Sequence, residues 1–207
     1  VYKRQALLIM LGAVSGAVFA QAPRVIKGVP LFPGSRVDEA LMENELRLFE
    51  ETTAEMMGLL NKGIRVMVTT ATPEEVCRWY IAKLKAKEDK GGGNDLSRVV
   101  SGGTSPVLYE LDYYEADAFK AQFERDLLIR AGAWVERSLR DRPKWANGKN
   151  LLGARFIWEF MNEDDGRSEI CLVIDDASFD FERKTFQPKT SITMTLLEFP
   201  EDGSDFD

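Results

Sequence analysis

The clearest pattern of apolar and polar residues runs from residue 64 to residue 84, where a strand passes directly into a helix. Three β-branched residues recur at every second position and predict a strand with one apolar face: Ile64, Val66 and Val68. Thr72 and Pro73 then form a typical helix start, and Glu75 can complete a capping box with Thr72. We expect Glu74 and Glu75 to face the positive end of the helix dipole. The helix that follows has one apolar face, made by Val76, Cys77, Tyr80, Ile81 and Leu84.

The rest of the chain carries the same two kinds of pattern. Helical spacing covers two further segments, 38–60 and 115–140, with residues 61–63 ending the first of them. Strand spacing covers four further segments, 107–113, 155–161, 169–175 and 191–199. Prolines and glycines predict an extended entry at 23–35, a turn at Pro33-Gly34 and a long flexible loop at 90–106. This order predicts an α+β domain, with a largely antiparallel sheet and two or three helices packed on one side.

The first twenty residues have the pattern of a secretory signal peptide. Lys3 and Arg4 precede an apolar stretch at 6–20, which is shorter than the roughly 20 residues that span a bilayer comfortably. Small residues favour cleavage after Ala20, and no cysteine lies nearby to carry a lipid. We therefore expect a signal peptide at 1–20, a single α+β domain at 21–200 and a disordered acidic tail at 201–207. The expected location is the periplasm or the extracellular space.

Charge narrows the range of partners. The chain of 207 residues has 27 basic and 34 acidic side chains, a formal net charge of −7. Cleavage of the signal peptide removes Lys3 and Arg4 and no acidic residue, which leaves 25 basic and 34 acidic side chains and a net charge of −9. Such a chain is repelled by phosphate backbones and anionic lipids. We therefore expect no nucleic-acid partner and no stable membrane insertion after signal cleavage.

A local basic patch stands out against this acidic background. It comprises Arg137, Arg140, Arg142, Lys144 and Lys149, together with Trp145. One interpretation is a docking surface for an acidic protein or an anionic envelope component. The other is a set of cations at a helix C-terminus, followed by a solvated loop.

The two cysteines, Cys77 and Cys171, also allow two interpretations. In an oxidising compartment they could pair, because a helix packed on a sheet can bring two such positions within range. Two separate buried thiols are the alternative.

The absence of histidine excludes several chemistries. It removes Ser-His-Asp and Cys-His catalysis and His-ligated metals, and two cysteines are too few for a four-thiolate metal site. We expect no cofactor, no metal and no catalytic residue. Residues 162–166 do not fit a calcium loop, since Met161 and Leu172 occupy positions that need acids. Four acids in or beside predicted strands could still support glycan hydrolysis, although strand alternation places them on a solvated face: Glu110, Glu159, Glu169 and Asp175.

Two short motifs carry a resemblance. The entry VPLFPG at 29–34 and the helix start TPEEV at 72–76, with Trp79-Tyr80, resemble a pattern in uncharacterised bacterial secreted and envelope proteins. That pattern has a P-x-x-P-G entry, then a strand leading to a PEEV…(W/F)Y helix. The resemblance covers residues 29–84 and implies an exported α+β domain without bringing any catalytic residues.

These observations favour a non-catalytic exported module that binds a protein partner or an envelope component. Two alternatives stay open. The first is a carboxylate-dependent glycan hydrolase. The second is a membrane-tethered envelope protein with an uncleaved N-terminal helix.

Overall fold

The computed structural model describes residues 22–52, 61–89, 103–114, 139–162, 166–180 and 185–199. In chain order the elements are η1 (Ile26–Gly28), β1 (Arg36–Val37), α1 (Glu39–Thr52), β2 (Asn61–Thr69), α2 (Pro73–Leu84), β3 (Lys87–Glu88), β4 (Leu108–Tyr113), β5 (Leu151–Met161), β6 (Arg167–Asp176), β7 (Phe179–Asp180), β8 (Thr185–Phe186) and β9 (Thr190–Glu198). The predicted signal peptide, most of the predicted helix 115–140 and the acidic tail lie outside the described residues.

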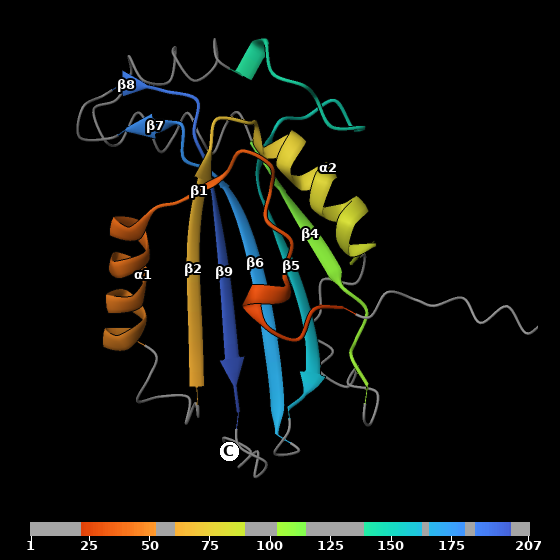
Figure 1. The fold of residues 1–207 in the computed structure, drawn as a ribbon. Helices are drawn as coiled ribbons and strands as arrows, with labels where there is room; N and C mark the ends of the chain where they lie inside the picture. Colours follow the sequence, from red (N-terminus) through yellow and green to blue (C-terminus); the bar gives the residue numbers. More distant parts are fainter. Residues whose placement is uncertain are drawn as a thin grey trace, which may run out of the picture.

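One large sheet organises the described part of the chain (Figure 1). Its seven strands follow the order β1-β2-β9-β6-β5-β4-β3, and all neighbours are antiparallel except the short pair β3 and β4. β7 and β8 form a separate two-stranded ribbon. The predicted α+β class with a largely antiparallel sheet is confirmed.

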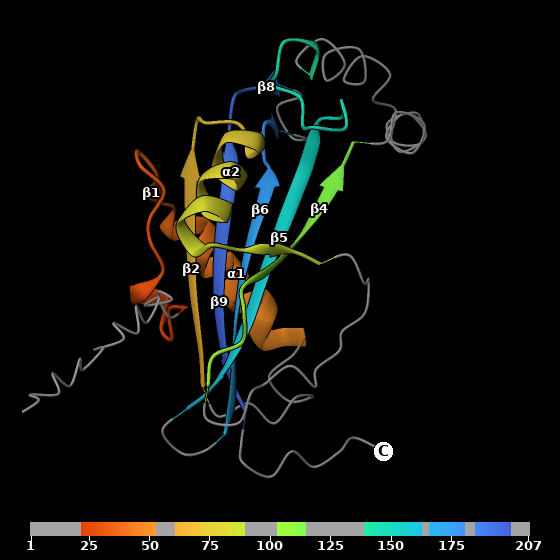
Figure 2. The same cartoon turned by 90° about the vertical axis from the view of Figure 1, so that its right-hand side faces the viewer.

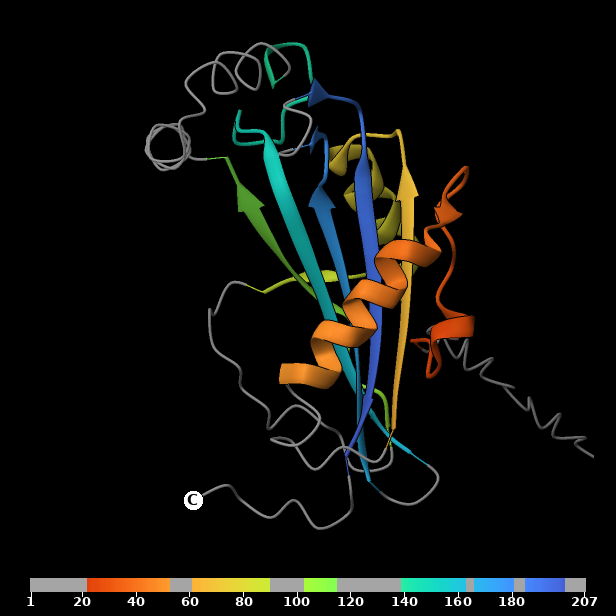
Figure 3. The ribbon, with the colours of Figure 1, turned by 90° about the vertical axis from the view of Figure 1, so that its left-hand side faces the viewer.

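The two described helices lie on opposite faces of this sheet, not on one side as the sequence suggested. α2 covers one face in Figure 2, and α1 crosses the other face in Figure 3. The reason lies in β2, where Val66, Met67 and Val68 are all buried although consecutive strand residues point to opposite faces. A strand with two buried faces needs cover on both sides.

The main core lies on the α2 side of the sheet. Trp158, Phe156, Ile170, Ile192 and Met194 point toward Tyr80 and Val76 of α2, and all are buried. The entry segment covers part of the same face, because Trp158 Nε1 donates to the Pro23 carbonyl at 2.6 Å and Val29 is 1% exposed.

The motifs behind the resemblance are packed against one another. Phe32 meets Trp79 edge to face at 5.5 Å between ring centroids, and Trp79 meets Tyr80 at 4.8 Å. The predicted Pro33-Gly34 turn is present, with Gly34 at φ 77° and Ser35 N donating to Phe32 O at 3.0 Å. The entry and the helix start therefore belong to one packing unit.

The helix start forms as predicted. Glu75 N donates to Thr72 Oγ1 at 3.3 Å, and Thr72 N donates to Glu75 Oε2 at 2.8 Å, which completes the capping box. Two strands begin earlier than predicted, β2 at Asn61 and β5 at Leu151. Within the described ranges, every helix is too short or too polar to cross a bilayer.

Candidate functional site: a groove beside α2

The first turn of α2 carries a buried carboxylate. Glu74 is 0% exposed, and its Oε1 accepts from Leu151 N at 2.9 Å and more weakly from Asn150 Nδ2 at 3.5 Å. Its Oε2 accepts from Arg142 Nη2 at 2.9 Å. Glu74 lies in the first turn of α2, as expected from the sequence, and it also anchors the segment before β5.

Arg142 joins Glu74 to a second buried carboxylate, Asp176 at the end of β6. Its Nη1 donates to Asp176 Oδ2, and its side chain is only 10% exposed. Burial lowers the pKa of Arg142, but the charges of Asp176 and Glu74 outweigh this and raise it. Tyr114 also donates to Asp176 at 2.8 Å, and burial followed by the charge of Asp176 raises the pKa of this hydroxyl. We call Glu74, Arg142 and Asp176 the buried ion network.

The buried ion network holds residues 143–150 beside the outer side of α2. There Arg78 Nη2 donates to the Lys144 carbonyl at 2.9 Å, and the Arg78 guanidinium lies 4.7 Å from the centroid of the Trp145 ring. A tight turn completes the segment, with Gly148 N donating to Trp145 O at 2.8 Å and Gly148 at φ 78°. Trp145 is thereby fixed against the partly buried edge of the core.

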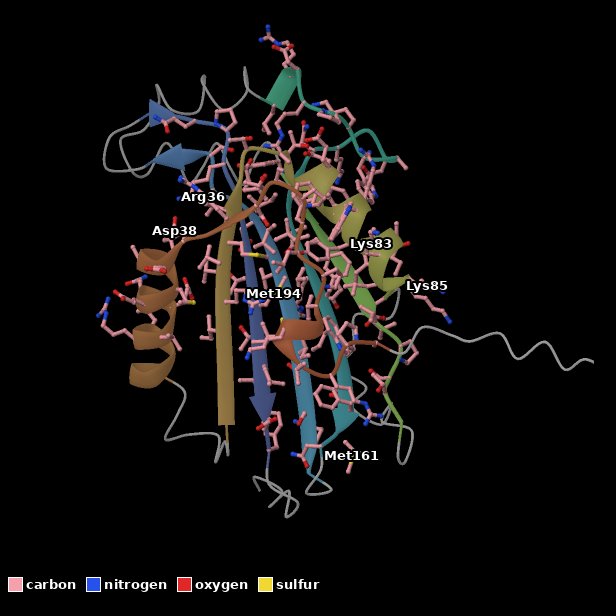
Figure 4. The ribbon with its side chains drawn as sticks, in the orientation of Figure 1. Arg36, Asp38, Lys83, Lys85, Met161 and Met194 are labelled. Atoms are coloured by element: carbon pink, nitrogen blue, oxygen red, sulfur yellow. The ribbon has the colours of Figure 1, made fainter. Side chains whose placement is uncertain are left out.

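An open groove of about 460 Å³ runs between α2 and this segment. We call it the α2 groove; it is lined by Arg78, Ile81, Ala82, Tyr109, Lys144, Trp145 and Ala146. Its lining contains two aromatic rings, two cations and no acidic side chain. Lys83 and Lys85 lie at the C-terminal end of α2, outside the groove lining (Figure 4), and Lys83 Nζ lies 5.8 Å from the centroid of the Trp79 ring.

A second pocket, of about 230 Å³, lies above the buried ion network. Its lining includes Arg142, Lys189, Ser178 and Thr190. Both cations are already compensated, because Arg142 pairs with two carboxylates and Lys189 Nζ lies 3.7 Å from Asp38 Oδ2. This pocket is therefore less suited to an acidic ligand than the α2 groove.

The structure divides the predicted basic patch. Arg137 lies outside the described residues, and Arg140 is exposed at the end of a helical turn. Two buried carboxylates draw the Arg142 guanidinium inward, and the docking role of Arg142 stays a prediction. Lys144 and Trp145 do line the α2 groove.

Two groove residues were missed from the sequence, for different reasons. Arg78 lies on the exposed side of α2, so its helical position could have suggested it. Tyr109 comes from β4, and nothing in the sequence places that strand beside Trp145.

The two cysteines are free, so the suggested disulfide is not formed. Cys77 packs into the α2-side core, where burial raises its pKa to about 12. Cys171 alternates with the core residues Ile170 and Leu172 and therefore points to the opposite face of the sheet. Burial raises the pKa of Cys171 to about 11. The sheet separates the two thiols.

The strand acids do form one close pair. Glu159 in β5 stands directly opposite Glu169 in β6. Glu159 is 7% exposed, so the expected solvated position is wrong for this residue. Burial raises the pKa of both carboxyls, and the nearest cation to Glu159 is Arg167 at 3.9 Å.

Neither Glu159 nor Glu169 lines the two pockets described above. Glu110 is instead paired with Arg155 at 2.7 Å on an exposed part of the sheet, and Asp175 is exposed. The described residues also contain no group of three or more Cys, Asp or Glu placed to hold a metal ion.

Comparisons of the chain with protein-family models, with curated proteins and with solved structures found no match.

Proposed function

We propose that the protein is an exported, non-catalytic module that binds an acidic partner protein through the α2 groove. The observation that carries the proposal is the lining of this groove, where Arg78 is stacked on Trp145 and no acidic side chain is present. Aromatic and arginine side chains are the residue types that dominate binding energy at protein interfaces. Binding of a partner to Trp145 loses little conformational entropy, since the buried ion network already fixes the segment that carries this side chain.

Arg78 has the geometry to receive a carboxylate. One of its N–H groups is used by the Lys144 carbonyl, while the planar guanidinium carries five donors in total. A carboxylate from a partner can therefore form charge-assisted hydrogen bonds with the remaining donors. The apolar floor, made by Ile81, Ala82 and Ala146, suits a hydrophobic side chain next to that acid.

A capture experiment with three matched baits tests this function. The baits are the unaltered protein, Arg78→Glu in the groove and Lys27→Glu on the exposed surface of η1. We expect envelope extract to yield a partner with the unaltered and Lys27→Glu baits and to lose it with Arg78→Glu. Capture should also weaken as salt rises, because exposed charge pairs are screened. A partner that Arg78→Glu retains, or the absence of any specific partner, would contradict the proposal.

Arg78→Lys separates charge from shape in the same experiment. Lysine keeps the positive charge but loses the planar stacking on Trp145 and the two-pronged hydrogen bonding. We expect binding between that of the unaltered protein and that of Arg78→Glu.

The two alternatives make different predictions. A glycan hydrolase would cleave chromogenic glycosides and lose that activity in Glu159→Gln or Glu169→Gln, because these two carboxyls form the closest strand pair. A membrane-tethered protein would keep its N-terminus and stay in the membrane fraction. An exported module should instead begin at Gln21, which N-terminal sequencing of the exported protein determines.

A further inference from the structure

The cations of Arg78 and of the C-terminal end of α2 have no carboxylate partner in the part of the chain that the structure describes. Among the described residues, no carboxylate lies within ion-pair distance of Arg78, Lys83 or Lys85. This is unusual for a chain in which acidic residues outnumber basic ones by 34 to 27. By contrast, Arg142 and Arg155 each pair with carboxylates at short range. The groove surface therefore has positive charge that an outside acidic segment can neutralise.

The chain contains a segment with the complementary chemistry. Residues 200–207 read PEDGSDFD and carry four acids and one aromatic ring. Phe206 stands between Asp205 and Asp207. Its ring matches the apolar side chains of the groove, and the flanking carboxylates match the guanidinium of Arg78.

We propose that the α2 groove of one molecule binds residues 200–207 of a second copy. This rests on the proposed function, in that the groove must be a binding site. Reciprocal exchange of the two segments closes a two-fold dimer and leaves no groove empty. The two grooves then gain affinity together, because binding of the first segment raises the effective concentration of the second.

The distance from the last described residue to the groove favours a second copy over the same copy. Phe199 is fixed at one end of the sheet, where its N–H donates to Arg167 O at 2.8 Å and its ring lies 4.4 Å from the Arg167 guanidinium. The strand register places Tyr109 of the groove level with Met194 of β9, in one row of residues that runs across the strands. Phe199 is therefore about 16 Å from that row along the strand, and β9 is three strand spacings, about 14 Å, from β4.

A fully extended chain from Phe199 to Phe206 spans at most about 24 Å. The direct line is more than about 20 Å long, so the segment would reach the groove of its own molecule only when almost fully extended. The groove of a neighbouring molecule imposes no such limit, and the second copy is therefore the occupant that the distance favours.

Sedimentation velocity of the purified protein over a range of concentrations tests the proposal. We expect a reversible dimer that weakens at high salt. Arg78→Glu, and separately the full chain with Asp205→Asn, Phe206→Ser and Asp207→Asn, should dimerise at least roughly tenfold more weakly. Lys27→Glu should dimerise like the unaltered protein.

Mixing the variants shows whether the segment binds in trans. The tail variant keeps an intact groove, and Arg78→Glu keeps an intact tail, so an equimolar mixture should form a heterodimer through one groove. A labelled peptide of residues 198–207 should bind the tail variant and not Arg78→Glu. A protein that stays monomeric at every concentration, or a tail variant that dimerises normally, overturns the proposal. If Arg78→Glu still loses an envelope partner in that case, the proposed function stands and only the second copy as occupant is excluded.

Discussion

Arg142 and Glu74 lie 68 positions apart in the chain and meet as a buried ion pair, with 2.9 Å between Arg142 Nη2 and Glu74 Oε2. Glu74 is wholly buried in the first turn of α2. Arg142 belongs to the segment before β5, so the ion pair holds that segment against α2. The same guanidinium reaches Asp176 at the end of β6. One arginine thus joins a helix start, a connecting segment and a strand end, and this junction places Trp145 in the α2 groove.

Arg142→Met should lower the free energy of unfolding by about 3–5 kcal/mol, because it leaves two buried carboxylates without their cation. Urea denaturation measures this change. Arg155→Met is the matched control, since its partner Glu110 is 40% exposed and Arg155 itself 47% exposed. An exposed pair contributes at most about 1 kcal/mol. Equal losses for the two variants would contradict the special role of the buried ion network.

The sequence predicted α2 and its capping box correctly because each interaction there joins neighbours in the chain. Thr72 and Glu75 are three positions apart, and their hydrogen bonds depend on little else. Glu74 has the same local context, but its partners Arg142 and Leu151 come from far along the chain. Local pattern therefore placed Glu74 correctly in the first turn of α2, but only the tertiary contacts show that Glu74 and Arg142 form a buried ion pair.

Strand alternation explains where the rest of the prediction was incomplete. Ile64, Val66 and Val68 correctly indicated one apolar face of β2, while Met67 on the other face is also buried. A period-two pattern does not reveal that second layer, so the helices were placed on one side. The sequence predicts the end of a helix at Asn61 and Gly63, because their pairing with Glu198 and Leu196 in β9 leaves no local sign.

The two thiols should not react in the native protein. Burial raises the pKa of Cys77 to about 12 and that of Cys171 to about 11, so both stay protonated at neutral pH. We expect Ellman's reagent to detect no thiol in the folded protein and both thiols after denaturation. Electrophoresis without reducing agent should show the same mobility as with it. A mobility shift or a missing thiol would indicate the disulfide that the structure lacks.

Glu159→Gln should stabilise the protein at neutral pH and not at acidic pH. Burial raises the pKa of Glu159 in the folded state above its usual value of 4.5, and its Oε2 atom has no hydrogen-bond partner among the described residues. Below the pKa that Glu159 has in the unfolded chain, its carboxyl is protonated in both states and costs no stability. As pH rises through the higher pKa of the folded state, the free energy of unfolding of the unaltered protein falls. Gln carries no charge and avoids that loss.

We expect a gain on the order of 1 kcal/mol at pH 7, because Arg167 at 3.9 Å offsets only part of the cost of burying this carboxylate. Chemical denaturation at several pH values measures the difference between the two proteins. Glu110→Gln is the control, because Glu110 is exposed and paired with Arg155. A gain that persists unchanged at acidic pH would show that charge is not the cause.

Lys85→Gly should raise the free energy of unfolding by roughly 0.5–1 kcal/mol. Lys85 ends α2 in the left-handed region at φ 52° and ψ 38°, and its N–H donates to Ile81 O. A side chain is strained in that conformation, while glycine adopts it freely. Glycine also gives the unfolded chain more freedom, which offsets part of the gain.

Lys83→Gly is the matched control for this substitution, two positions earlier in the same helix. It removes the same charge from the same end of α2, so any effect of lysine on the helix dipole is shared. Within the helix, however, glycine costs about 1 kcal/mol relative to good helix formers. The two variants should therefore change stability in opposite directions, as thermal denaturation would record. A loss in both would mean that the lysine charge, and not the backbone conformation at Lys85, governs the end of the helix.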